Sequence, residues 1–573
     1  MYGLLLALVA SLPFEPIRPL VSLGFFDLNH LKLLLAAIGV VWAVRLGADR
    51  HLPRETWLAA AFVGVAVASA VAAESFRSEA LKFVGRLASG VFMLLVVRRV
   101  LQAHPGRLIA LAWAASVGAG LSALLGIGEV AGWPGLQPIL SLFKLAPTRV
   151  GGDLRLGASF QYATIAAVFF EVVVPVALIL AATDAVRWRR FGASGIAIVC
   201  SVAVVLTLTR GGMIALAAAL GLLSIFACAR PGWRRVLLPT ALAGASGAVV
   251  LAVVGTRLDS FGPRFETEND WDWYGATYAA PASLTLAQDI PANADVTVQN
   301  TGQVTWTTDG PQRFTLAYRW LSGDAASQLT VPATMLDLPH NIAPGEAVQV
   351  PVEIVAHLPP GDYRLAWGML QQHVLWFHDR GDRDAETLVH VTGTANTSAI
   401  SSVGEEPRSD TSVAVPPVPR TTLWAAALRM FRQHPLLGVG PDNFRHLYGA
   451  YLGLPEWDDR VHANNLYLEL LADLGGVGLL AFGALVAPSI VGLSRGLRAS
   501  GKLSPRTVAD QRFVAMRFSA TVRGHVWLAG LSASLLAFYL HSTVDSFLEF
   551  TPVYLLFWLI VGMSLAAAEI DRW

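Results

Sequence analysis

The first candidate for chemistry is a histidine followed by two amide side chains at the start of an apolar segment. The run is His462-Ala463-Asn464-Asn465, and Glu469 follows within the next two helical turns. A histidine with a pKa near ~6.5 can accept a proton at working pH, which makes His462 a candidate general base. The alternative interpretation is that His462 is a cap or a packed polar group at a helix start.

The second candidate is an arginine that divides a long apolar stretch into two segments. Arg210 stands between Thr209 and the pair Gly211 and Gly212. Arginine at the centre of a bilayer costs about 2.5–3.5 kcal/mol, so it is rarely placed there without a role. A guanidinium matches phosphate oxygens with a fork of donors, so Arg210 is a candidate phosphate clamp. The alternative is that it only marks a helical hairpin turn.

Three further arginines are candidates for substrate binding. Arg420 opens an amphipathic segment that ends in a glycine-rich turn, Arg155 precedes an apolar span, and Arg86 lies inside another. Solvation is the default for a surface arginine such as Arg420. Intramembrane pairs of Arg86 with Glu171, or of His541 with Asp545, would be purely structural.

The composition requires that these side chains be positioned by membrane helices. The chain has 573 residues, 54% hydrophobic and 14% charged, whereas soluble domains carry about a quarter charged residues. Because a span needs roughly 20 apolar residues, the candidate spans are about 2–14, 29–47, 56–73, 80–97, 108–132, 158–182, 192–209, 211–229, 236–255, 463–492, 525–544 and 550–568. We read the first apolar segment as a retained span rather than a signal peptide.

Lysine and arginine cluster in alternate short connections between these spans. The basic groups lie at 45–54, 98–107, 187–190, 230–235 and 495–523. Positive charge stays on the cytoplasmic side, so both termini are predicted inside and the polar candidates mostly fall at the outer face. The net charge of +1 gives no field for nucleic acid.

Residues 271–395 lose the membrane pattern. Segments 295–300 and 348–354 alternate apolar and polar residues between turn signals, which predicts short strands of a β-sandwich. Four tryptophans, at 306, 320, 367 and 376, are the expected core. The module resembles tryptophan-rich immunoglobulin-like domains. It is interpreted either as a rigid spacer or interaction domain, or as a sugar-binding domain that uses exposed tryptophans.

The predicted domains are an N-terminal transmembrane bundle at 1–257, the β-sandwich at 271–395, a linker at 396–419, and an amphipathic helix with C-terminal spans at 420–573. Cys200 and Cys228 fall inside apolar segments, so neither a disulfide nor a cysteine metal site is expected. We expect no metal and no cofactor, because the sequence lacks a phosphate-binding loop and a His-Glu-x-x-His motif.

With these residues in place, the chain resembles the O-antigen ligase/polymerase superfamily of bacterial envelope proteins. The matching stretches are 206–212, Arg420 with 435–444, and 462–478, with a weaker fourth at 155–160. Many members have a histidine directly before the second asparagine, where this chain has Asn464.

The resemblance implies a polytopic α-helical protein of the bacterial inner membrane, with its active site and β-domain on the periplasmic side. It implies metal-independent transfer of a glycan from an undecaprenyl-diphosphate carrier to an acceptor hydroxyl, with inversion at the anomeric carbon. By the same resemblance His462 is the general base and Arg210 and Arg420 clamp the diphosphate. Asn464, Asn465, Arg155 and Arg86 complete the predicted substrate site.

The motifs leave the acceptor open among a lipid A core, another lipid-linked glycan and a protein hydroxyl. A transporter or flippase of the same lipid-linked glycan is the alternative from another class. A sensor or scaffold anchored by the membrane part is the third hypothesis, which twelve spans disfavour.

Overall fold

The computed structural model of the chain describes residues 1–22, 27–46, 53, 55–229, 234–258, 260–267, 270–310, 312–323, 329, 331–393, 417–499 and 511–570. The predicted linker 396–419 lies almost wholly outside these residues. The side chains of the predicted basic groups at 45–54 and 495–523 lie outside the described part as well.

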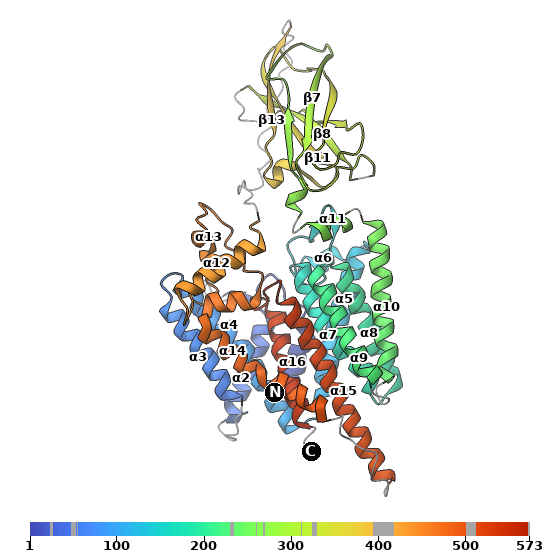
Figure 1. Cartoon of the computed structure of the whole chain (residues 1–573), viewed down its shortest axis with the longest axis vertical. Helices are drawn as coiled ribbons and strands as arrows, with labels where there is room; N and C mark the ends of the chain where they lie inside the picture. The colour runs from blue at the N-terminus through green and yellow to red at the C-terminus, as the bar shows by residue number, and fades with distance from the viewer. Residues whose placement is uncertain are drawn as a thin grey trace. The chain divides into compact units, whose positions relative to one another are not determined.

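The chain divides into two compact units (Figure 1). The first unit comprises Met1–Thr148, Leu154–Arg257 and Arg420–Trp573, and the second comprises Arg149–Asp153 and Leu258–Pro419. The short segment Arg149–Asp153 falls within the range predicted for the N-terminal bundle but belongs to the second unit.

The first unit is helical. Its helices are α1 (Tyr2–Ser11), α2 (His30–Leu46), α3 (Thr56–Ala72), α4 (Arg77–Ala103), α5 (Arg107–Val130), α6 (Gln137–Leu140), α7 (Ala163–Thr183), α8 (Arg187–Leu206), α9 (Arg210–Ala229), α10 (Arg234–Arg257), α12 (Arg420–Gln433), α13 (Phe444–Leu452), α14 (Leu466–Ala499), α15 (Gln511–His541) and α16 (Thr551–Ile570). A two-residue ladder joins β1 (Val21–Ser22) to β2 (Asp27–Leu28).

Eight described helices are long and apolar enough to cross a membrane, which is the pattern of a multi-pass membrane protein. They are α4, α5, α7, α8, α9, α10, α14 and α16, and each coincides with a predicted span. The other four predicted spans correspond to shorter apolar helices, Tyr2–Ser11, His30–Val44, Thr56–Ala72 and His525–His541. Twelve spans therefore stay a prediction.

Two helices, α7 and α16, form the centre of this unit, because both are buried along almost their whole length. A helix that is apolar all round is typically covered on every side by protein or lipid. Helix α7 packs against α5, α8 and α15, and α16 packs against α4, α14 and α15. The loop between α15 and α16 thus joins the central helix α16 to a helix that packs against both central helices.

The second unit contains a three-stranded and a six-stranded sheet. Its elements are α11 (Phe261–Glu266), the 3₁₀ turns η2 (Trp271–Trp273) and η3 (Phe377–Arg380), β3 (Arg149–Val150), β4 (Asp153–Leu154), β5 (Ala276–Ala279), β6 (Ser283–Ala287), β7 (Ala292–Asn300), β8 (Phe314–Ser322), β9 (Thr334–Asp337), β10 (Ala347–Ile354), β11 (Gly361–Gln371), β12 (Leu375–Trp376) and β13 (Ala385–Thr392). The small sheet has the order β10-β7-β5 and the large one β6-β13-β11-β8-β9, with β12 beside β11.

The predicted strands 295–300 and 348–354 are confirmed as parts of β7 and β10, which pair antiparallel with Val350 opposite Val296. Alternate residues of β10 are buried, as the period of a half-buried strand requires. Trp306, Trp320 and Trp367 lie in the core, as predicted. Trp376 is wrong as a core residue, because it is only partly buried and stacks on His378 at a ring-centroid distance of 5.5 Å.

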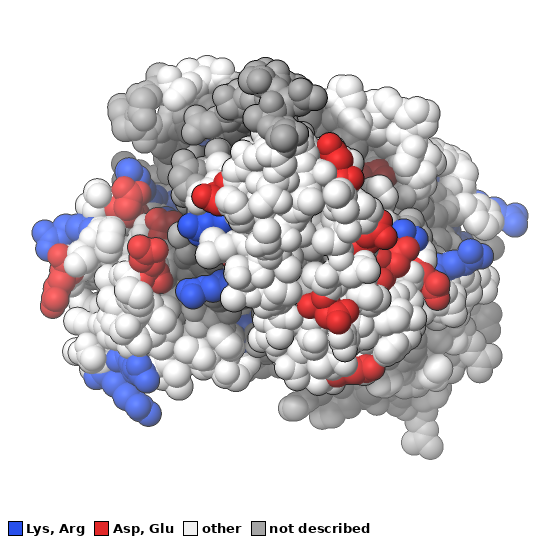
Figure 2. Space-filling view, turned by 90° about the horizontal axis from the view of Figure 1, so that it is seen from above, with Lys and Arg blue, Asp and Glu red and all other residues white. Residues whose placement is uncertain are grey.

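Lys and Arg on the face seen from above lie in small separate groups interspersed with Asp and Glu (Figure 2). A protein that binds the phosphate backbone of a nucleic acid normally presents a continuous basic surface. This distribution agrees with the near-neutral net charge of the sequence.

Candidate active site

Helix α14 begins at an asparagine cap. Asn465 Oδ1 accepts hydrogen bonds from the backbone N–H groups of Tyr467 at 3.1 Å and Leu468 at 3.0 Å. Its Nδ2 donates to the Thr543 carbonyl at 2.9 Å. These are the contacts of an N-cap residue, so Asn465, which was predicted to bind substrate, is engaged in fixing the helix start against the loop between α15 and α16.

His462 lies between two glutamates. Its Nδ1 is 2.5 Å from Oε1 of Glu469 and its Nε2 is 2.6 Å from Oε2 of Glu549. Glu469 Oε2 also accepts the backbone N–H of Ala463 at 3.2 Å. Only 8% of the His462 side chain is exposed, so the two carboxylates are its immediate environment.

This environment determines the charge of the histidine. Burial removes water and by itself lowers the pKa of His462, but Glu469 and Glu549 outweigh it and hold that pKa well above the usual value. An imidazolium has two N–H donors and no acceptor, so each ring nitrogen donates to one carboxylate. The predicted general base therefore presents no free lone pair in this arrangement.

A break in α14 holds the glycine-rich loop 435–444. Gly475 has φ +66°, which interrupts the helix and frees backbone groups on both sides of it. The N–H groups of Val439 and Gly440 donate to the carbonyls of Ala472 and Asp473 at 2.9 and 3.0 Å, and the Gly476 N–H donates to the Pro435 carbonyl at 2.8 Å. Loop 435–444 and the broken part of α14 thus form hydrogen bonds with each other's backbone groups.

Asp473 fixes the far end of the same loop. Its two carboxylate oxygens accept the backbone N–H groups of Asp442 and Phe444, both at 2.8 Å. Asp442 in turn accepts a hydrogen bond from Nη2 of Arg445 at 3.0 Å, and Arg445 Nη1 donates to the Asp459 carbonyl at 3.0 Å. These contacts fix the orientation of the Arg445 guanidinium, which lines the same cavity as His462.

A cavity of about 400 Å³ opens beside His462. Its charged lining comes from three segments: Arg445 from α13, Arg460 from the loop before α14, and Asp545 with Glu549 from the loop between α15 and α16. Asn464, at φ +48°, also lines it, and asparagine is one of the few non-glycine residues that adopts this conformation readily.

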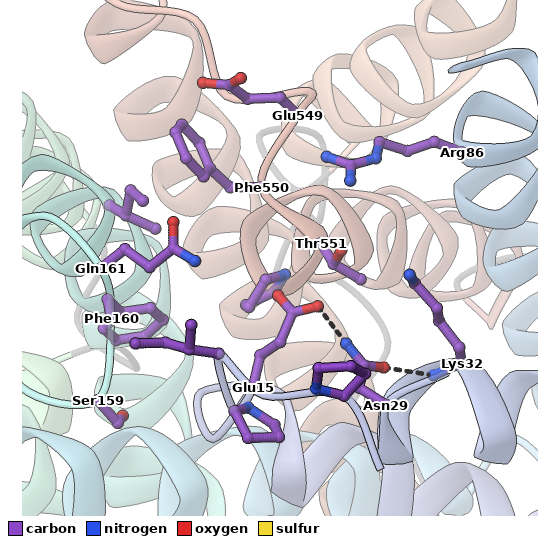
Figure 3. Close-up of a pocket in the computed structure, with 15 residues that line it drawn as sticks. Glu15, Asn29, Lys32, Arg86, Ser159, Phe160, Gln161, Glu549, Phe550 and Thr551 are labelled. Atoms are coloured by element: carbon purple, nitrogen blue, oxygen red, sulfur yellow. Dashed lines mark hydrogen bonds between the residues drawn. The ribbon is translucent and has the colours of Figure 1, made fainter. Parts of the chain in front are cut away.

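A second cavity, of about 360 Å³, shares Gln161, Phe550 and Glu549 with the first. Figure 3 shows Arg86 and Lys32 pointing into it from one side and Gln161 and Phe160 on the opposite side. A third cavity, of about 230 Å³, is lined by Arg86, Arg445 and again Glu549. Glu549 thus borders all three spaces.

Arg420 lies close to this cluster. Burial raises the pKa of Asp545 to about 6, while the positive charges of Arg420 and His462 oppose the rise. Both cations act on the same carboxylate, so Arg420 and His462 lie near each other at one end of the bundle. The two residues are 42 positions apart in the sequence.

Arg210 begins α9 next to His541. A Cβ atom added at Gly211 would lie 2.8 Å from Cδ2 of His541, and one added at Gly212 would lie 3.1 Å from Oε2 of Glu171. His541 Nδ1 is 2.9 Å from Oε1 of Glu171. The predicted pairs of Arg86 with Glu171 and of His541 with Asp545 are therefore wrong, because His541 binds Glu171 and Arg86 lines the cavities.

Arg155 has structural partners. Its Nε donates to the Thr207 carbonyl at 2.9 Å and its Nη2 to Oγ1 of Thr209 at 3.0 Å. Both acceptors belong to the turn that joins α8 to α9. The side chain that was predicted to bind substrate stabilises the turn that places Arg210.

Sequence reasoning did not select four residues of this site: Glu549, Glu469, Arg445 and Arg460. Glu469 carries a signal, because it lies on the first turns of the helix that follows His462. Glu549 and Arg460 lie in connections between helices, and Arg445 lies on the short helix α13. No sequence spacing points to a site at any of the three. Among the residues that the structure describes, His, Cys, Asp and Glu form no group of three or more that could hold a metal ion.

Residues 387–483 match the family model described as O-antigen ligase. This match confirms the resemblance to the O-antigen ligase/polymerase superfamily in the part of the chain that contains His462 and the 435–444 loop. A comparison with curated proteins found no match. A solved structure of Pseudomonas fluorescens alkylpurine DNA glycosylase AlkC, bound to DNA containing an abasic site analog, is similar with a TM-score of 0.14 and 12% identity, and the likeness covers 59% of this chain and 97% of that chain. A TM-score this low carries no argument.

Proposed function

We propose that this chain, which carries the O-antigen ligase domain of the O-antigen ligase/polymerase superfamily, transfers a glycan from an undecaprenyl-diphosphate carrier to an acceptor hydroxyl. The observation that supports this proposal most directly is the charged cavity beside His462, bordered by Arg445, Arg460 and Glu549. It lies at the end of an apolar helical bundle, where a lipid-linked substrate would present its polar part.

The charges of the site suit a diphosphate leaving group. As the glycosidic carbon separates from the carrier, negative charge develops on the diphosphate oxygens, and fixed guanidinium groups stabilise it. We propose Arg210 and Arg420 as diphosphate clamps, with Arg86, Arg445 and Arg460 as further cations near the polar head. Each hydrogen bond to a charged group contributes about 1.5–3 kcal/mol.

The bacterial inner membrane is the proposed location, with the active site and the β unit on the periplasmic side. The support is the clustering of Lys and Arg in alternate connections of the sequence, which the positive-inside rule assigns to the cytoplasm. We also propose that the two sheets form an immunoglobulin-like sandwich that acts as a spacer or interaction domain. Burial of Trp306, Trp320 and Trp367 disfavours a sugar-binding role for those side chains.

The proposal is tested by assaying the purified chain in detergent with an undecaprenyl-diphosphate glycan and an acceptor glycan. We expect a new glycosidic bond, detected as a longer product by mass spectrometry, and the same yield with a chelator. The variants Arg420→Ala and His462→Ala should abolish the product while the chain remains folded. Full product from both variants would exclude this site as the place of transfer.

The same assay separates the alternative functions. A transporter or flippase would move the lipid-linked glycan across reconstituted vesicles and leave its chain length unchanged. The acceptor is identified by replacing the acceptor glycan in turn with a lipid A core and with a protein that carries free hydroxyls. The acceptor that becomes glycosylated distinguishes polymerase, ligase and protein oligosaccharyltransferase.

A further inference from the structure

Glu549 occupies the junction of the three cavities at the end of the bundle. It belongs to the loop between α15 and α16, and 27% of its side chain is exposed, against 8% of that of His462. One space beside it contains Arg86 and Lys32, and the other contains Arg445 and Arg460. A side chain at this junction can contact molecules bound in either cavity. His462, which lies buried behind Glu549, borders only one of the cavities.

The two carboxylates that contact His462 differ in what they are free to do. Glu469 uses Oε1 for Nδ1 of His462 and Oε2 for the Ala463 N–H, so both of its oxygens are committed to the same loop. Glu549 uses Oε2 for Nε2 of His462, and among the described residues no hydrogen bond involves its Oε1. Glu549 therefore keeps one carboxylate oxygen available to the cavities.

We propose that Glu549 is the general base of the glycan transfer and that His462 is a positioning residue. The inference rests on the proposed function, because it names the group that takes the proton in that reaction. His462, fixed by Glu469, donates its Nε2–H to Oε2 of Glu549 and orients this carboxylate at the junction. Oε1 of Glu549 then faces the acceptor hydroxyl.

The step balances as a single displacement. The hydroxyl proton of the acceptor passes to Oε1 of Glu549, and the hydroxyl oxygen forms a bond to the anomeric carbon of the donor. The bond from that carbon to the diphosphate oxygen breaks, and its electron pair leaves with the lipid diphosphate beside the arginines. Water or buffer later removes the proton from Glu549.

The cavities on the two sides of Glu549 fit the two substrates of such a displacement. The space with Arg445 and Arg460 also contains Asp545, and the space with Arg86 and Lys32 also contains Glu15. Both spaces offer two cationic side chains, and both reach Glu549. A base must lie between acceptor and donor, within hydrogen-bond reach of the attacking hydroxyl. In the described structure, Glu549 borders both spaces, whereas both nitrogens of His462 contact carboxylates.

The pH dependence separates the two candidate bases by its sign. Glu469 on α14 contacts His462, and Arg420 acts on the pair through Asp545. The other charged groups that face the pair line the same cavities: Asp545, Arg445, Arg460, Arg86, Lys32, Glu15, Glu79, Lys82 and Asp442. With Glu549 as base and His462 as imidazolium, kcat is high at neutral pH and falls in alkali as His462, whose pKa is raised, loses its proton. With His462 as base, kcat is low at neutral pH and rises as the pH passes its elevated pKa.

The test compares kcat and KM for wild type, Glu549→Gln and His462→Gln from about pH 5 to about pH 9. The glutamine at 549 keeps an oxygen for the His462 N–H but cannot accept a proton. We expect Glu549→Gln to lower kcat by about 10²–10⁴-fold with KM changed by less than about threefold. We expect His462→Gln to retain part of kcat and to lose the alkaline fall. The control Glu386→Gln, which breaks an ion pair with Arg364 in the β unit, should behave as wild type.

A second measurement distinguishes a base from a structural residue. In Glu549→Ala, added formate should restore part of kcat in proportion to its concentration, because a small carboxylate can enter the space and accept the proton. The inference is overturned if Glu549→Gln keeps kcat within about threefold of wild type, or if formate has no effect on Glu549→Ala. A wild-type chain that forms no glycosidic bond contradicts the proposed function itself, whereas an active wild type with an active Glu549→Gln contradicts only this inference.

Discussion

Glu469 and Asp473 lie one turn apart on α14, and each holds a different loop of the candidate site. Glu469 binds the His462 segment, and Asp473 accepts the backbone N–H groups of Asp442 and Phe444. Residues four apart lie on the same face of a helix. One face of α14 therefore fixes the position of the His462 loop relative to the glycine-rich loop 435–444.

Asp473→Asn should weaken the attachment of loop 435–444 to α14. Both carboxylate oxygens of Asp473 accept backbone donors, and an asparagine would turn its NH₂ group toward one of them. A buried donor that loses its acceptor costs about 1–3 kcal/mol, so we expect a lower Tm and faster proteolysis within 435–444. Thermal unfolding in detergent measures the change, with the exposed Glu456→Gln as control. Equal Tm values for Asp473→Asn and wild type would contradict this account of the loop.

Gly475→Ala should be much more damaging than an alanine elsewhere in the same helix. Gly475 has φ +66°, and an added Cβ would overlap the Leu436 carbonyl. The left-handed conformation alone costs a non-glycine residue about 1–2 kcal/mol. Gly483 has open space around its Cβ position, so Gly483→Ala is the matched control. We expect loss of Tm and of folded yield for the first variant only; similar Tm values for both would show that the break is not constrained.

The tryptophans of the β unit offer a matched pair for stability. Trp306 is fully buried and packs edge-on against Phe377 at a centroid distance of 5.5 Å, whereas Trp376 is partly buried beside Arg319. We expect Trp306→Ala to destabilise the β unit by about 3–5 kcal/mol and Trp376→Ala to have a much smaller effect. Limited proteolysis within 271–395, followed during heating, measures both. Comparable losses would mean that Trp376 also supports the core.

Local sequence patterns predicted the elements well, because each depends on nearby residues. The apolar runs predicted twelve spans, and eight of them coincide with described helices long and apolar enough to cross a membrane. The alternation at 348–354 predicted a half-buried strand, β10. The predicted span 463–492 begins three residues before α14, which starts at Leu466 after the Asn465 cap. The proximity of Arg420 to the His462 region follows from motif similarity and not from either segment alone.

The contacts that fix the chemistry were beyond prediction from one sequence. The raised pKa of His462 depends on Glu469 and also on Glu549. Glu549 lies 87 positions away, and no local pattern pairs it with His462. The guanidinium of Arg155 is a residue type that binds phosphate. In the structure it donates hydrogen bonds to the carbonyl of Thr207 and to the hydroxyl of Thr209. Side chains that satisfy buried backbone groups and those that bind substrate have the same residue types, so only packing separates them.

Arg86 should contribute to donor binding. It borders two of the cavities that reach Glu549, and one of these also contains Lys32. Losing one charge-assisted contact costs about 1.5–3 kcal/mol, so we expect Arg86→Ala to raise KM for the lipid-diphosphate donor by about 10–100-fold. Arg86→Lys should be intermediate, because lysine keeps the charge but not the fork. Arg189→Ala, at an exposed position in the first turn of α8, is the control, and an unchanged KM for Arg86→Ala would place the donor elsewhere.

Asp545 should make stability depend on pH with a defined sign. Burial raises the pKa of Asp545 to about 6 despite Arg420, so the folded chain binds this proton more tightly than the unfolded chain. Its contribution to the free energy of unfolding is greatest below about pH 4, the usual range of an aspartate, and is lost as the pH rises to about 6. Asp545→Asn stays neutral and keeps an oxygen for the Ser546 N–H, which lies 2.9 Å from Oδ1. The Tm of wild type minus that of the variant should therefore decrease from about pH 4 to about pH 6, and a difference that is flat or increases over this interval would show that Asp545 is not desolvated.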